Sequence, residues 1–120
     1  PIFEGYKNCS NIVQTGWIPS EKAYDFFLAS DLAFFPGSHS VLWEQAVACS
    51  LPIVVKHWKG IEHINVNGNA ILLDEMNIDT ISQTIKELHN TTKYREMQAK
   101  AKSVASQFFL REIARKGIGE

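Results

Sequence analysis

The sequence predicts an α/β fold, in which helices flank an open parallel sheet. Three observations lead to this fold class: short unbroken apolar runs, helix-forming segments between them, and turn residues that separate the two. Strands covered by helices on both faces have such apolar runs. Strands that alternate with helices along a chain usually pair in parallel through right-handed crossovers. We expect residues 1–120 to form a single domain, since one domain usually takes ~100–200 residues.

The first half of the chain is expected to hold three strands and two helices. Ile12 and Val13 are β-branched and are followed by Gly16 and Pro19, which favour a turn; this pattern is typical of a strand. Ser20 is suited to cap the first helix. Trp43, in the second helix, is expected to pack in the core or between domains rather than to stack on a base. The expected elements are strands at residues 11–17, 32–35 and 52–55, and helices at residues 21–30 and 41–49.

The second half continues the alternation. A polar loop, with one helical turn around residues 62–66, leads to a fourth strand, and the next helix is capped by Asn77 or Asp79. That helix has an apolar stripe of Ile78, Ile81, Ile85 and Leu88. Two C-terminal helices are expected over about residues 92–118, with a break near Gln107. The first has Tyr94, Met97, Ala101 and Ala105 on one side, and the second has an apolar face of Phe109, Ile113 and Ala114. The loop spans residues 56–69 and the strand residues 70–73.

Composition and charge exclude several classes of protein. Hydrophobic residues make up 45% of the chain and charged residues 21%, as in a globular domain. The net charge of −1 argues against a nucleic-acid binder, and no apolar run approaches the ~20 residues of a membrane span. Cys9 and Cys49 are too few for a disulfide framework, and the four histidines lack metal-ligand spacing. We expect no bound metal and no permanently bound cofactor.

Ligands of an open α/β sheet bind outside the carboxyl ends of its strands, which here are followed by residues 17–20, 36–40 and 56–61. Gly37 permits close backbone approach, while Ser38 and Ser40 can cap the next helix, whose first N–H groups favour a phosphate. Plain capping is the alternative. His39 is the candidate catalytic residue: it can stabilise a leaving diphosphate, or it can simply cap the turn.

Glu44 is the candidate ligand-binding carboxylate. It lies in a helix whose other residues are almost all apolar, and a buried carboxylate needs partners. Its two oxygens suit the vicinal hydroxyls of a ribose. In the alternative interpretation, it interacts with the helix dipole and pairs with Lys56 or Lys59. Those two lysines and His57 form a small cationic cluster that can line a phosphate site or belong to an exposed loop.

The order of these motifs resembles the donor-binding half of GT-B glycosyltransferases, closest to those of bacterial surface-polysaccharide and capsule synthesis. The resemblance rests on GWIPSEKAYDFFLASDLAFFPGSHSVLWEQAVACSLPIVV, then KGIE and NGNAILL, and covers about residues 11–118. It implies a Rossmann-like sheet, the C-terminal half of a GT-B fold, that binds a UDP- or GDP-sugar donor. Glu44 would hold the ribose hydroxyls, residues 37–40 the diphosphate, and Lys56, Lys59 and Gly60 would lie near the base or sugar.

The sequence departs from the family pattern at three points. Pro36 stands where retaining members carry a first glutamate, and the loop is shorter, with GSHS at the sugar-facing segment, so the anomeric outcome stays open. Ser50 replaces a usual glycine, which is a modest change. The family's acceptor site and catalytic base lie largely in a second, N-terminal domain. The chain is therefore expected to be a part of a two-domain protein, inactive alone. The acceptor would be a glycan or a lipid-linked molecule. The whole protein would be cytoplasmic, either free or peripheral at the inner face of the membrane.

Two rival functions fit the same elements. UDP-N-acetylglucosamine 2-epimerases that do not hydrolyse their substrate share the GT-B-like architecture, and would need acidic residues for proton transfer in the other domain. A non-catalytic α/β binding module is the other alternative. In that module Glu44 would pair internally with a lysine.

Overall fold

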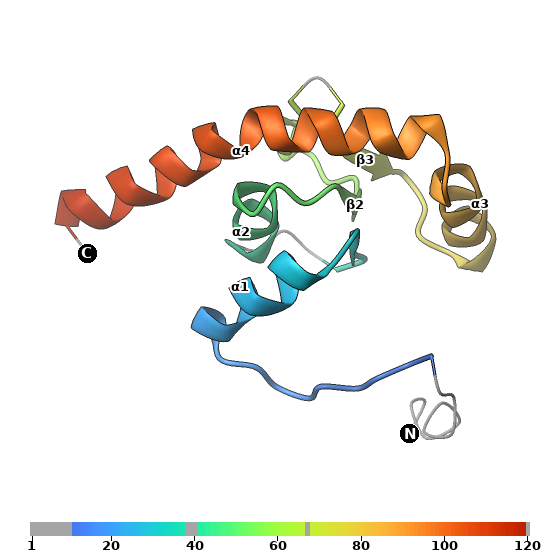
Figure 1. Cartoon of the computed structure of the whole chain (residues 1–120), viewed down its shortest axis with the longest axis horizontal. Coiled ribbons are helices and arrows are strands. Elements are labelled where there is room, and N and C mark those ends of the chain that lie inside the picture. The colour runs from blue at the N-terminus through green and yellow to red at the C-terminus, as the bar shows by residue number, and fades with distance from the viewer. Residues whose placement is uncertain (1–10, 38–40, 67, 120) are drawn as a thin grey trace.

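The computed structural model describes residues 11–37, 41–66 and 68–119, with side chains, except that of Ser20, as far as Phe108 (Figure 1). It confirms an α/β fold with a small open parallel sheet flanked by helices. In chain order, the elements are α1 (Ser20–Ala29), β1 (Ala33–Phe35), α2 (Val41–Ala48), β2 (Ile53–Lys56), the 3-10 turn η2 (Glu62–Ile64), β3 (Ala70–Leu73), α3 (Ile78–Leu88) and α4 (Thr92–Gly119).

The sheet has the order β1-β2-β3, and both pairs of strands are parallel. Ile53 of β2 lies opposite Ala33 of β1 and Ala70 of β3, so the three strands start level. Because all strands run in one direction, their carboxyl ends meet at one edge of the sheet. That edge is where the loops leading to α2, η2 and α3 begin.

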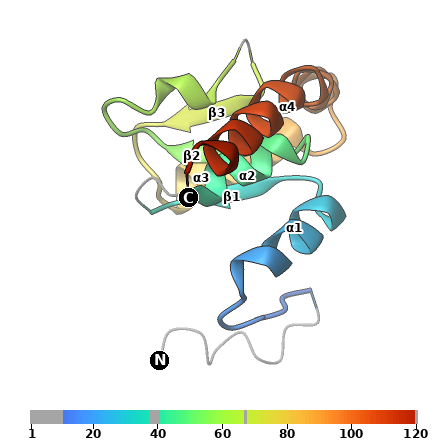
Figure 2. The same ribbon diagram turned by 90° about the vertical axis from the view of Figure 1, so that its left-hand side faces the viewer.

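Two apolar clusters cover the two faces of the sheet. Alternate residues of a strand point to opposite faces; accordingly, Ile53 and Val55 pack with α2, η2 and the second half of α4, while Val54 packs with α3 and the start of α4. Trp43, 1% exposed, is the largest of the fully buried side chains and confirms its expected place in the core. Helix α4 packs on both α2 and α3, and so joins the two layers (Figures 1 and 2).

Local signals account for several helix boundaries. Asn77 and Thr80 form a reciprocal capping box at the start of α3, as expected from Asn77. Helix α2 ends in a Schellman motif: the Leu51 N–H donates to the Ala46 carbonyl, and the Ser50 N–H donates to the Val47 carbonyl. Ser50 takes the left-handed position of this motif with φ +63°. Glycine is the usual residue at that position because it has no Cβ.

The prediction of a strand over residues 11–17 was wrong. This segment has no regular secondary structure, and the side chains of Val13 and Trp17 are exposed. A β-branched pair favours a strand only where a neighbouring strand offers hydrogen bonds and packing. The edge of β1 forms no ladder with this segment. The described sheet consequently has three strands rather than the four expected.

The helices also differ from expectation in detail. Helix α1 begins at Ser20, with Pro19 in the cap position where Ser20 was expected. Helix α4 runs unbroken past Gln107, whereas two helices were expected; the proposed apolar face of Phe109, Ile113 and Ala114 lies beyond the described side chains. In α3, the predicted stripe is only partly buried: Ile78 is 82% and Ile85 47% exposed, while Thr84 and Leu88 are buried. Thr84 tolerates this place because its hydroxyl donates to the Thr80 carbonyl.

Candidate functional site

The carboxyl edge of the sheet brings together the polar side chains that follow the strands. Lys56 ends β2, and His57 and Trp58 come directly after it. Asp74 follows β3, and Glu62 begins η2. These side chains contact one another through the interactions described below. We call Lys56, His57, Trp58, Glu62 and Asp74 the carboxyl-edge cluster.

Trp58 connects the loops that follow β1 and β2. Its indole Nε1 donates a hydrogen bond of 3.0 Å to the carbonyl of Gly37. The Lys56 ammonium lies 5.4 Å from the centre of the indole ring, within the range of a cation–π interaction. Lys56 also donates to the backbone carbonyl of Asp74. Trp58 therefore links the end of β2 to the end of β1, and Lys56 links it to the end of β3.

His57 lies between two carboxylates. Its Nδ1 is 3.0 Å from Asp74 Oδ1, and its Nε2 is 3.2 Å from Glu62 Oε1. The hydrogen bond with Asp74, followed by that with Glu62, raises the pKa of His57 above its ordinary value. The pKa of Glu62 is lowered, first by its own backbone N–H and then by His57. The arrangement therefore favours a positively charged imidazolium that donates to both acids.

Glu44 lies in the first turn of α2, within a run of five buried residues from Trp43 to Val47. Its side chain is 11% exposed, and its Oε1 is 3.8 Å from Nε2 of His63. At that separation the pair attracts only when His63 is protonated, and it is longer than a hydrogen bond. One internal contact of this carboxylate is thus with a histidine of η2, whereas the alternative interpretation of the sequence had named Lys56 or Lys59. Lys56 is engaged instead with Asp74 and Trp58.

The turn η2 connects the two groups of contacts. Glu62 and His63 are neighbours in this turn; Glu62 contacts His57, and His63 contacts Glu44. Ile61 and Ile64, on either side of them, are buried in the core and hold the turn in place. Through this turn, Glu62 of the carboxyl-edge cluster is the chain neighbour of His63, which contacts the carboxylate of α2.

The predicted site residues other than Glu44 fall into three groups. Ser38, His39 and Ser40 lie outside the described residues. Gly37 and Lys56 meet through Trp58. Lys59 and Gly60 form an exposed turn in which Gly60 has φ +92°, so the backbone itself requires glycine at Gly60. At Gly37 a Cβ atom would meet nothing within 4 Å, so packing does not require glycine there.

Sequence reasoning missed four residues of this edge: Trp58, Glu62, His63 and Asp74. Asp74 had a usable signal, because it directly follows a strand of the same parallel sheet. The other three precede or lie in η2, where one irregular turn decides which side chains face the strand ends. No pattern of spacing indicates such contacts.

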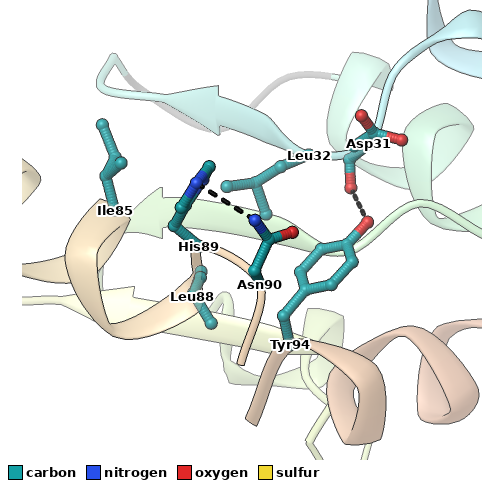
Figure 3. Close-up of a pocket in the computed structure, with 7 residues that line it drawn as sticks. All are labelled: Asp31, Leu32, Ile85, Leu88, His89, Asn90 and Tyr94. Carbon is teal, nitrogen blue, oxygen red and sulfur yellow. Dashed lines mark hydrogen bonds between the residues drawn. The ribbon is translucent and has the colours of Figure 1, made fainter. Parts of the chain in front are cut away.

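Several cavities lined by described residues lie away from this cluster, and two of them are the larger ones. One, of about 400 Å³, is at the amino edge of the sheet, where the Tyr94 hydroxyl donates to the Asp31 carbonyl (Figure 3). Burial, and then the charge of Asp31, raise the pKa of Tyr94. The other, of about 920 Å³, is mostly apolar and lies between residues 16–19, α1, β1 and α2. The first is lined by Asp31, Leu32, Ile85, Leu88, His89, Asn90 and Tyr94.

Within the described part of the chain, no three His, Cys, Asp or Glu residues are grouped so that they could hold a metal ion. In the same residues, no helix combines the length and the apolar character needed to cross a membrane. Cys49 is half-buried in the turn after α2, and burial raises the pKa of its thiol, as in a packed rather than a reactive cysteine.

Comparisons with protein-family models, with curated proteins and with solved structures find no match to the chain.

Proposed function

We propose that the chain is the donor-binding domain of a glycosyltransferase of the GT-B kind, and that it binds a nucleoside diphosphate sugar. Three features support the proposal: the parallel sheet, the polar side chains at its carboxyl edge, and Glu44 on the helix that follows β1. The sugar acceptor would be bound by a second domain, and the domain described here would supply the donor.

The proposal depends most on the position and the burial of the Glu44 carboxylate. This carboxylate, 11% exposed, lies in the first turn of the helix that follows β1, where ligands of a parallel α/β sheet bind. A carboxylate has two oxygens with about four acceptor sites, so it can accept from both hydroxyls of a ribose while His63 stays nearby. Its place one turn into α2 would set the ribose beside the start of that helix, where the diphosphate gains from the helix dipole.

The rest of the donor would lie along the carboxyl edge. The diphosphate would be held by residues 37–40, with His39 beside the leaving oxygen, and by the ammonium groups of Lys56 and Lys59. Charge that builds up on the leaving diphosphate would be stabilised by these donors, which is electrostatic catalysis. The base or the sugar would lie near Gly60.

The test is a calorimetric titration of UDP, GDP and their sugars into the wild-type chain and into Glu44→Gln and Glu44→Ala. Two hydrogen bonds to a charged group contribute about 1.5–3 kcal/mol each, or about 3 kcal/mol or more together, so Glu44→Ala should weaken binding by roughly a hundredfold or more. Glu87→Gln is the matched control, since it removes an exposed carboxylate on α3 that pairs with Lys93. Equal affinities for the wild type and Glu44→Ala would refute the ribose assignment, and failure of every nucleotide to bind the wild type would refute the function.

A second candidate is a non-catalytic α/β interaction module. It is favoured by one observation, the position of His63 at 3.8 Å from Glu44, which offers the carboxylate an internal partner. The two functions differ in thermal unfolding. A ligand at 100 times its dissociation constant stabilises a protein by about 2.7 kcal/mol, so a donor-binding domain should melt at a higher temperature with nucleotide. A module without a nucleotide site should melt at an unchanged temperature.

A further inference from the structure

His57 forms the contact that joins two segments far apart in the sequence. Asp74 comes from the turn after β3, and Glu62 comes from η2. These are the charged groups that face the imidazole ring. Lys56, the neighbour of His57 in β2, directs its ammonium to the backbone carbonyl of Asp74. The ring therefore meets a carboxylate on each side, and Lys56 contacts the backbone, not the carboxylate, of one of these two residues.

The number of ring protons decides whether both contacts can exist. A protonated imidazole has two N–H donors, one for each carboxylate. A neutral imidazole has a single N–H, so one ring nitrogen would turn its lone pair toward a carboxylate oxygen at 3.0 or 3.2 Å. That contact is repulsive. Loss of the proton should therefore release one of the two acids from the ring.

Release of Glu62 would change the position of the next residue in η2, which contacts Glu44. The neighbour of Glu62 in η2 is His63, whose Nε2 lies 3.8 Å from Glu44 Oε1. Buried Ile61 and Ile64 keep the backbone of the turn in the core. We consequently expect Glu62 and His63 to change their orientation while the turn stays packed on the core.

We propose that His57 is a positioning residue: in its doubly protonated form it ties η2 to the turn after β3, and so sets His63 against Glu44. The regulatory part of this inference rests on the proposed function, since it takes Glu44 as the ligand contact. The raised pKa of His57 agrees with the geometry. The link is complete below the ordinary pKa of histidine, ~6.5, and is lost as pH rises through the raised pKa. Donor affinity should change over the same pH interval.

The experiment is an NMR titration of the wild-type chain that follows the His57 ring and the backbone amides of residues 61–65. We expect the ring to titrate above the ordinary histidine pKa and the amides to shift with the same midpoint. Asp74→Asn and Glu62→Gln should each lower that midpoint, and Glu87→Gln, at the Glu87–Lys93 pair, should leave it unchanged. His57→Gln should abolish the amide shifts at this midpoint.

Three outcomes separate the ideas. A His57 ring that titrates at or below the ordinary value, or amides of residues 61–65 that do not follow it, would overturn the positioning role whether or not nucleotide binds. Amides that follow the ring, with no binding of UDP or GDP at any pH, would support the structural link and refute the proposed function. Nucleotide affinity that varies with pH through the His57 midpoint in the wild type, but not in His57→Gln, would support both.

Discussion

Replacing Ser50 with glycine is expected to stabilise the protein. Ser50 has φ +63° at the left-handed position of the Schellman motif that ends α2. In this conformation the Cβ of an L-residue lies too close to the following carbonyl oxygen. The buried Leu51 and Ala46, which the motif also joins by a hydrogen bond, hold the backbone in place. The chain therefore cannot relieve the strain by changing φ at Ser50.

The magnitude follows from two opposing effects. The left-handed conformation costs an L-residue about 1–2 kcal/mol. Glycine also destabilises the folded state by about 0.4–1 kcal/mol, because it increases the conformational freedom of the unfolded chain. The net stabilisation is about 0.5–1 kcal/mol, and 1 kcal/mol raises the melting temperature by roughly 4 °C in a domain of about this size.

Urea unfolding followed by circular dichroism would measure the effect. Ser50→Ala is the matched control, because it removes the hydroxyl but keeps the Cβ, and it should give no stabilisation. Asn90→Gly provides a second comparison: Asn90 also has a positive φ, +55°, but asparagine tolerates this region, so the gain should be smaller. A Ser50→Gly variant no more stable than Ser50→Ala would refute the strain argument.

Three further predictions concern the core, the start of α3 and pH. Trp43→Ala should destabilise the chain by about 3–5 kcal/mol in urea unfolding, as for other buried aromatic residues, whereas Trp17→Ala, at a side chain 87% exposed, should change stability by less than about 0.5 kcal/mol. Asn77→Ala removes the capping box of α3 and should lose about 1 kcal/mol in the same assay; an unchanged midpoint would mean that the cap is unimportant. Because the folded-state pKa of His57 is raised, its contribution to stability should be present at low pH and disappear as pH rises through that pKa; His57→Gln should remove this pH-dependent component from unfolding curves, and a persisting component would assign it to another group.

The parallel sheet could be predicted because each strand is an unbroken apolar run with clear ends. Pro36 and Gly37 close the run that forms β1, and the observed β3 has the expected bounds. Trp43 and the capping residue Asn77 were predictable for similar local reasons. Residues 11–17 were not, because a strand depends on a partner that local propensity does not contain.

The site was less predictable than the fold. Glu44 was found because a single carboxylate in an apolar helix is conspicuous in the sequence. Its neighbour His63 and the pair of acids around His57 depend on the path of one irregular turn and on contacts 17 residues apart. Ser50 shows the same limit in the backbone: the sequence marks the replacement of a usual glycine, but only the structure gives its positive φ.

The most direct test of the proposed function is a double-mutant cycle between Glu44 and the ribose hydroxyls. Calorimetry would give the affinities of the wild type and Glu44→Gln for UDP and for 2′,3′-dideoxy-UDP, or for the guanine pair if GDP binds better. If the carboxylate accepts from the ribose, removing either partner should weaken binding, and removing both should lose less than the sum. We expect a coupling energy of about 1 kcal/mol or more. Losses that simply add, with a coupling energy near zero, would contradict the assignment of Glu44 to the ribose.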